Sequence, residues 1–184
     1  MTRRFVAVCC ALALIGCCGG GRPPVRAGVY ADRVCSATAD WLRKVQLRAG
    51  TVADAVSPAT TPAEGREVLR RYVDAVVSET RTVVAAVRDA GEPDVADGAA
   101  IAEHLVGALE AARGALEAAE KEVASLPTSS RTAFTAAAQA LALRIGTRVG
   151  EVAVALHRLS STALDRAFEA SRPCRSITAT GASG

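Results

Sequence analysis

The sequence has few aromatic residues, few histidines and few lysines, and these shortages limit both its core and its chemistry. Aromatic residues make up 3% of the 184 residues, although hydrophobic residues make up 50%. The core must therefore be built from Ala, Val and Leu. Such small side chains suit closely packed helices better than a β-sandwich.

Motifs of several enzyme classes are also missing. The sequence has no phosphate-binding loop, no dinucleotide fingerprint and no glycine-flanked nucleophile. Neither histidine, His104 or His157, has a Glu three residues before it, as a di-iron bundle requires. A zinc or haem site formed by both requires the helices to bring them face to face, and boundary or surface positions are the simpler interpretation. We therefore predict no enzyme activity, no catalytic residue, no metal site and no cofactor.

The charge is nearly balanced overall but unevenly distributed. Once Arg3 and Arg4 are removed with the signal described below, 20 basic residues face 19 acidic ones, which is far less basic than a typical nucleic-acid-binding protein. We therefore expect no nucleic acid partner. Residues 89–125 hold nine acidic residues, whereas 127–184 hold seven arginines, among them Arg144 and Arg148. This asymmetry favours the two segments lying side by side, although these two arginines can also meet an acidic partner or a lipid head group.

The first sixteen residues have the layout of a secretory signal. Arg3 and Arg4 form a positive start, Phe5–Ile15 is an apolar run of eleven residues, and Gly16 follows. The run is too short to span a bilayer as a mature helix. We therefore predict that residues 1–16 are a cleaved signal peptide.

Leu14-Ile15-Gly16-Cys17 resembles the lipobox of bacterial lipoproteins, with a branched residue, a tolerated residue and a small residue before cysteine. The resemblance implies that Cys17 receives a diacylglyceryl group and becomes the first residue after cleavage. It also implies a cell-membrane location, lipid-anchored on the extracytoplasmic face, with membrane lipid as a partner. Cys18 fits less well as the modified residue. The alternatives are an ordinary secretory signal and an uncleaved membrane anchor. The preference for arginine over lysine is typical of a high-GC genome, such as that of an actinobacterium.

Residues 17–27 are predicted to be a lipidated flexible tether, because three glycines are followed by Pro23 and Pro24. Helical spacing of apolar residues then predicts a helical bundle over 28–175 and a disordered tail over 176–184. Trp41, the only tryptophan, is expected to anchor the core of the first helix.

Four helices are expected in this region. The second begins at Thr61, which is followed by Pro62 and by Glu64, the pattern of a capping box. The third is capped by Asp94 or Asp97, and the fourth by one of residues 128–130. The fourth is the longest and is expected to continue to about Ser171, either protruding or bending near its glycines at 146 and 150. The predicted fold is all-α, an antiparallel up-down four-helix bundle with a long C-terminal helix.

Two of the six cysteines, Cys35 and Cys174, are predicted to form a disulfide. Outside the cytoplasm a surviving pair is expected to be oxidised. In an up-down bundle the start of the first helix and the end of the fourth lie at the same end, so the topology brings the two cysteines together. The alternative is two unpaired buried thiols.

These features predict a binding or structural role at the cell envelope, with an envelope protein as partner. The specific activity is not encoded in any recognisable motif. The competing hypothesis is a carrier that holds a small apolar or haem-like ligand between its helices, and a cavity above about 300 Å³ would favour it.

Overall fold

A computed structural model describes residues 23–55, 61–157 and 161–181. These residues form helices and no strand, so the predicted all-α class is confirmed; the one β-type contact is an isolated bridge between Val25 and Pro93. The helices are, in chain order, α1 (Ala27–Ala55), α2 (Pro62–Asp89), α3 (Gly98–Ala124), α4 (Arg131–His157), α5 (Thr162–Ala170) and α6 (Arg172–Gly181).

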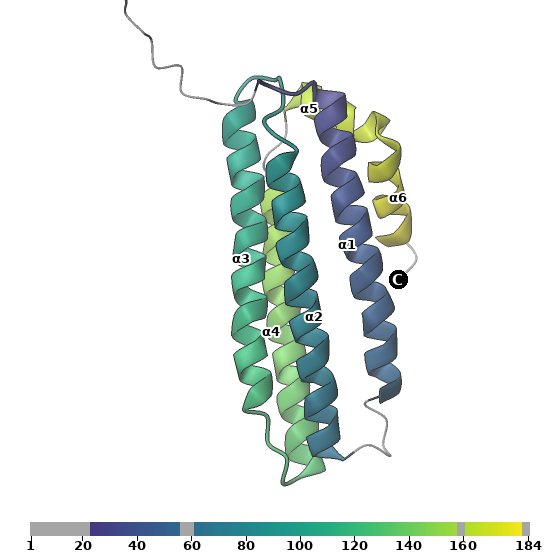
Figure 1. Cartoon of the computed structure of the whole chain (residues 1–184), viewed down its shortest axis with the longest axis vertical. Helices are drawn as coiled ribbons and strands as arrows, with labels where there is room; N and C mark the ends of the chain where they lie inside the picture. The colour runs from purple at the N-terminus through teal and green to yellow at the C-terminus, as the bar shows by residue number, and fades with distance from the viewer. Residues whose placement is uncertain (1–22, 56–60, 158–160, 182–184) are drawn as a thin grey trace, which may run out of the picture.

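The helices α1 to α4 are long, and each runs in the direction opposite to the one before it (Figure 1). They contain 27 to 29 residues each, which corresponds to about 40 Å at 1.5 Å per residue. Along the chain, α1 packs on α2, α2 on α3, and α3 on α4, while α5 and α6 both pack on α1. The short helix α5 lies at the upper end of Figure 1, and α6 runs back down beside α1.

The start of α2 has the predicted capping box. The Thr61 backbone N–H donates to a carboxylate oxygen of Glu64 at 2.8 Å, and the Glu64 backbone N–H donates to Thr61 Oγ1 at 3.3 Å. Pro62 takes the first helical position, where a missing N–H costs nothing. At α4, Ser130 acts as the cap, since its hydroxyl accepts from the Ala133 backbone N–H at 3.4 Å.

The turn between α2 and α3 depends on two glycines. Gly91 has φ of +87°, a left-handed conformation that favours glycine. At Gly98 an added Cβ would lie 1.9 Å from the backbone oxygen of Pro93, so no other residue fits this turn without movement. Asp97, one of the two predicted caps, precedes α3 with φ of 59°, but its side chain makes no capping hydrogen bond.

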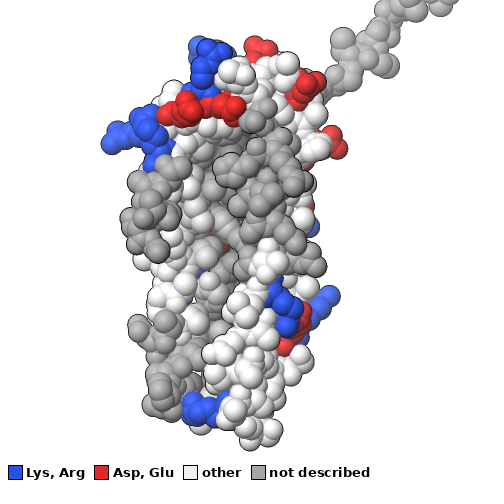
Figure 2. All heavy atoms as spheres, turned by 180° about the vertical axis from the view of Figure 1, so that it is seen from behind, with Lys and Arg blue, Asp and Glu red and all other residues white. Residues whose placement is uncertain are grey.

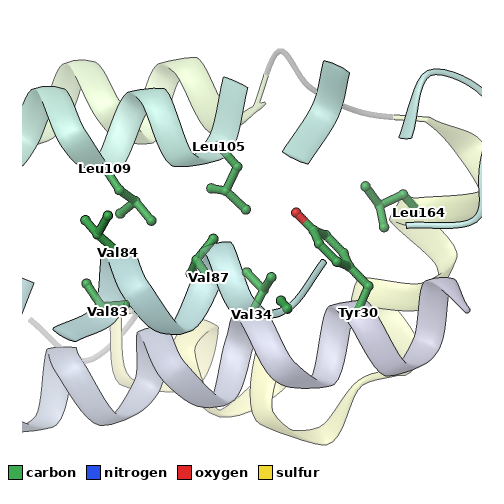
Figure 3. Close-up of a cluster of buried hydrophobic side chains, with 9 residues drawn as sticks. Tyr30, Val34, Val83, Val84, Val87, Leu105, Leu109 and Leu164 are labelled. Carbon is green, nitrogen blue, oxygen red and sulfur yellow. The ribbon is translucent and has the colours of Figure 1, made fainter. Parts of the chain in front are cut away.

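The buried apolar side chains form two clusters along the long axis. In the upper cluster, side chains from α1, α2, α3 and α5 converge, including Tyr30, Val87, Leu105 and Leu164 (Figure 3). The lower cluster joins α2, α3 and α4, and Phe134 belongs to it. Both clusters consist mainly of Val, Leu and Ala, as the composition predicts, and this allows the helices to approach closely.

Trp41 connects α1 to α2 through packing and a hydrogen bond, as expected of a residue that anchors the first helix to the core. It packs against the upper cluster, and its Nε1–H donates to Thr80 Oγ1 at 3.1 Å. Thr80 is fully buried, and its own hydroxyl donates to the Val76 carbonyl oxygen at 2.7 Å. The only indole of the chain is thus hydrogen-bonded at the helix interface, where a buried polar group needs a partner.

The expectation of one long C-terminal helix to Ser171 is wrong. Ser161 is extended, with φ of −116° and ψ of 145°, and its hydroxyl accepts from the Leu164 backbone N–H at 3.2 Å, which starts α5 as a new helix. The helix α4 therefore matches the length of its neighbours and is continuous through its glycines at 146 and 150. The side chains of residues 148–157 lie outside the described part of the chain.

The expectation of a disordered tail over 176–184 is wrong for residues 176–181, which belong to α6. Pro173 lies in the first turn of α6. Proline is tolerated there because the first N–H groups of a helix have no intrahelical partner. The remaining residues, 182–184, lie outside the described ranges.

Cys35 of α1 and Cys174 of α6 are joined by a disulfide, with their Cα atoms 5.0 Å apart. The two residues are 139 positions apart in the sequence. At the same end, Val25 is held by two backbone hydrogen bonds of 2.7 Å, donating to the Glu92 oxygen and accepting from the Asp94 N–H. The described chain therefore begins beside the α2–α3 turn, at the end of the molecule that also carries α5.

Candidate functional site: the groove between α1 and α6

A surface groove of about 780 Å³ lies between α1 and α6. Among the described residues, six of α1 and four of α6 line it, and most of the exposed surface of this lining is apolar. The residues are Ser36, Ala39, Asp40, Leu42, Arg43 and Gln46 from α1, and Arg172, Pro173, Ser176 and Ile177 from α6.

The helical period explains why these residues share the groove. On α1, Ser36, Ala39 and Arg43 are three or four positions apart, so their side chains lie along one face. On α6, Pro173 and Ile177 are four positions apart and face α1. The disulfide at the upper end of the two helices fixes the distance between these faces.

The α1 side of the groove carries a network of ion pairs. Asp40 pairs with Arg43 and, at 3.0 Å, with Lys44, and the hydrogen bond from Lys44 is the main reason that the pKa of Asp40 is lowered. Lys44 also reaches Glu79 of α2 at 3.0 Å, and Arg48 reaches the same carboxylate at 3.3 Å. The positive charge of Arg43 is thus balanced by Asp40 within the groove.

Arg172 differs from Arg43. It is exposed at the start of α6, and within the described residues it makes neither an ion pair nor a side-chain hydrogen bond. The N-terminal end of a helix carries a partial positive charge, which adds to the charge of the guanidinium. The upper end of the groove therefore carries the positive charge of Arg172, while its floor of Ala39, Leu42, Pro173 and Ile177 is apolar.

The sequence-predicted sites have different outcomes. Cys35 and Cys174 are together at the upper end of the groove, whereas Cys17 and Cys18 lie outside the described residues. His104 is exposed, and the side chain of His157 lies outside the described part of the chain. Among the residues that the structure describes, no three His, Cys, Asp or Glu side chains form a group able to hold a metal ion.

The predicted pairing of acidic and arginine-rich segments occurs only in part. Arg144 of α4 pairs with Glu122 of α3. Arg81 and Arg88 belong to α2 and reach Glu117 and Glu110 at 2.9 Å each. The same two carboxylates also pair with Arg113 of α3 itself, and the side chain of Arg148 is not described.

Charged side chains of both signs lie next to one another on the rear face. Seen from behind, the described surface has red and blue residues together at the upper end and again along one lower edge (Figure 2). The described part of this face therefore has no extended field of one sign.

Sequence reasoning missed the groove because residues 176–181 of α6, which forms one of its walls, were expected to belong to a disordered tail. One signal was available: Pro173 and Ile177 are spaced as one face of a helix that starts near a proline. Comparison of the chain with protein-family models, curated proteins and solved structures finds no match. None of the described helices is both long and apolar enough to cross a membrane.

Proposed function

We propose that this protein is a lipid-anchored lipoprotein on the extracytoplasmic face of the cell membrane, with a binding role at the envelope. One observation carries the proposal: a lipobox-like stretch, Leu14–Cys17, precedes a domain whose remaining cysteine pair is bonded. Disulfides persist in oxidising compartments outside the cytoplasm, where the predicted signal would deliver the chain.

The bundle would be held close to the membrane in one orientation. Val25 lies eight positions after Cys17, a stretch that spans at most about 28 Å when fully extended. Val25 is hydrogen-bonded to the α2–α3 turn, so a lipid on Cys17 would keep this end of the molecule near the bilayer. The opposite end, with the α3–α4 connection, would then face away from the membrane toward an envelope protein partner.

The architecture suited to this role is an antiparallel up-down four-helix bundle of α1 to α4, to which α5 and α6 are added. The successive contacts of α1 with α2, α2 with α3, and α3 with α4 support it. The C-terminal helices would close the membrane-proximal end and supply the second wall of the groove.

Intact mass of the protein from a bacterial host that processes lipoproteins tests the anchor. We expect a chain that begins at Cys17 and carries a diacylglyceryl group, with two hydrogens gained on reduction. Cys17→Ala should abolish the lipid mass and release the protein from membranes, whereas the matched control Cys18→Ala should retain both. A chain that begins elsewhere without lipid would refute the anchor.

The second candidate, a carrier of a small ligand, is favoured by the volume of the α1–α6 groove. About 780 Å³ lies within the range of small-molecule sites, about 300–1,000 Å³. The groove lies beside the bundle and not between its long helices. Among the described residues that line it, none is a His, Met, Cys or Tyr that could ligate haem iron, so a haem-like ligand is not supported there.

A further inference from the structure

We propose that the groove between α1 and α6 binds a long-chain carboxylate, with its acidic head at Arg172 and its chain along the apolar floor. The inference follows from three features of one surface: its volume, its mainly apolar lining and one cation without a partner in the described structure.

The floor suits an unbranched apolar chain. Ala39 and Leu42 of α1 face Pro173 and Ile177 of α6, so both walls contribute carbon surface. From Ser36 to Gln46 the groove follows α1 for ten residues, which is about 15 Å at the helical rise, a distance that suits an extended acyl chain. Covering this floor removes apolar surface from water, and this favours binding.

The charge arrangement selects an anionic head. Arg43 is already paired with Asp40, and Asp40 also binds Lys44, so neither needs a ligand. Arg172 lacks such a partner and lies at the positive end of α6, next to the disulfide. A carboxylate there would gain a charge-assisted hydrogen bond, which is stronger than a bond between neutral groups.

The Ser176 hydroxyl of the α6 wall is already hydrogen-bonded, since it donates to the Pro173 carbonyl oxygen at 2.6 Å. We expect the long-chain carboxylate to enter from the bilayer, and this expectation rests on the proposed function. With Cys17 lipidated, the Arg172 end of the groove faces the bilayer.

Photolabelling of the processed full-length protein in phosphatidylcholine vesicles tests this assignment. Three diazirine probes are compared: a long-chain fatty acid, the matching long-chain alcohol and a short-chain acid. Mass spectrometry of peptides locates the label. We expect saturable labelling of α1 and α6 by the long-chain acid, and half-saturation at concentrations at least about tenfold higher for the other two.

Two variants and two matched controls separate head from chain. Arg172→Gln should raise the half-saturating concentration of the acid at least about tenfold and make acid and alcohol equivalent. Ala39→Trp should block labelling by filling the floor. Arg71→Gln, at an exposed arginine elsewhere, and Ala140→Trp, at an exposed position of α4, should bind as the wild type does.

Label scattered over the bundle, equal affinity for acid and alcohol in the wild type, or no effect of Arg172→Gln would overturn the proposal. If Ala39→Trp does not fold by circular dichroism, the acid-to-alcohol ratio of Arg172→Gln decides alone. Intact mass of the same preparation reports lipidation. If the protein carries no lipid, the labelling is repeated in buffer without vesicles. A protein that is not lipidated and a groove that does not bind the acid are therefore separate results.

Discussion

Replacing Tyr30 with phenylalanine tests whether the upper cluster is as dry as its packing indicates. The Tyr30 side chain is fully buried, and its hydroxyl has no hydrogen-bond partner in the described structure. It points between side chains of α2 and α3, close to Val87 and Leu105 (Figure 3). A buried hydroxyl without a partner costs about 1–3 kcal/mol, whereas the ring contributes its full apolar contact.

At neutral pH we expect Tyr30→Phe to raise the free energy of unfolding by about 1 kcal/mol, because the variant keeps the ring and removes the desolvated hydroxyl. If the hydroxyl made a stabilising hydrogen bond, Tyr30→Phe would lower the free energy of unfolding instead. Urea unfolding at pH 7, followed by far-ultraviolet circular dichroism, measures the difference.

The pH dependence provides a second, independent measure. Burial raises the pKa of Tyr30 from 10.0 to about 12. The folded state therefore favours the neutral phenol, and this stabilisation is complete below pH 10 and is lost as the pH rises through 12. Two pKa units correspond to about 2.7 kcal/mol, so the wild type should lose up to that amount relative to Tyr30→Phe.

The comparison uses urea unfolding of both proteins between pH 7 and pH 11.5. The pKa of Tyr72, the only other tyrosine, is also raised by burial, but Tyr72 is present in both proteins and cancels in the difference. If Tyr30→Phe instead lowers the free energy of unfolding at pH 7 by more than about 1 kcal/mol, the hydroxyl has a hydrogen-bond partner, because that loss is typical of a net hydrogen bond. If the difference in free energy of unfolding between the wild type and Tyr30→Phe does not change with pH, burial does not raise the pKa of Tyr30.

Three further variants and one control test, by urea unfolding, the contacts that hold the fold together. Cys35→Ser with Cys174→Ser should lower the free energy of unfolding by up to roughly 5 kcal/mol, because the bond closes a loop of 139 residues; an unchanged midpoint would contradict this. Gly98→Ala should cost about 2 kcal/mol or more, because its Cβ would strike the preceding turn, whereas the control Gly107→Ala, with open space around it, should add about 0.5–1 kcal/mol. Thr61→Ala should lower stability by about 1 kcal/mol, and no loss would refute a role for the capping box.

Local signals in the sequence were sufficient to predict a helix start where all the residues that form it are close together in the chain. Thr61, Pro62 and Glu64 lie within four residues, so their capping box needs no other part of the chain. The all-α class follows in the same way, because the spacing of Val and Leu along each segment has the period of a helix. The bonded pair Cys35–Cys174 was also predicted, but that prediction required the assumption of an up-down bundle in which both residues lie at the same end.

Tertiary structure decided how residues 161–181 are arranged. Ser161 and Pro173 are compatible with either the interior or the boundary of a structured segment, since serine occurs in helices and proline both ends and begins them. Packing removes the ambiguity: Leu164 inserts into the upper cluster, and the disulfide holds α6 against α1.

The sequence by itself determined the helical class, the starts of α2 and α4 and the lipobox-like stretch from which the anchor is proposed, because each depends on residues within a few positions of one another. The groove depended on the tertiary structure. Its two walls, around Ala39 and Ile177, are more than 130 residues apart in the chain. Helical periodicity indicates which face a residue occupies, but only three-dimensional packing determines which other face lies opposite it.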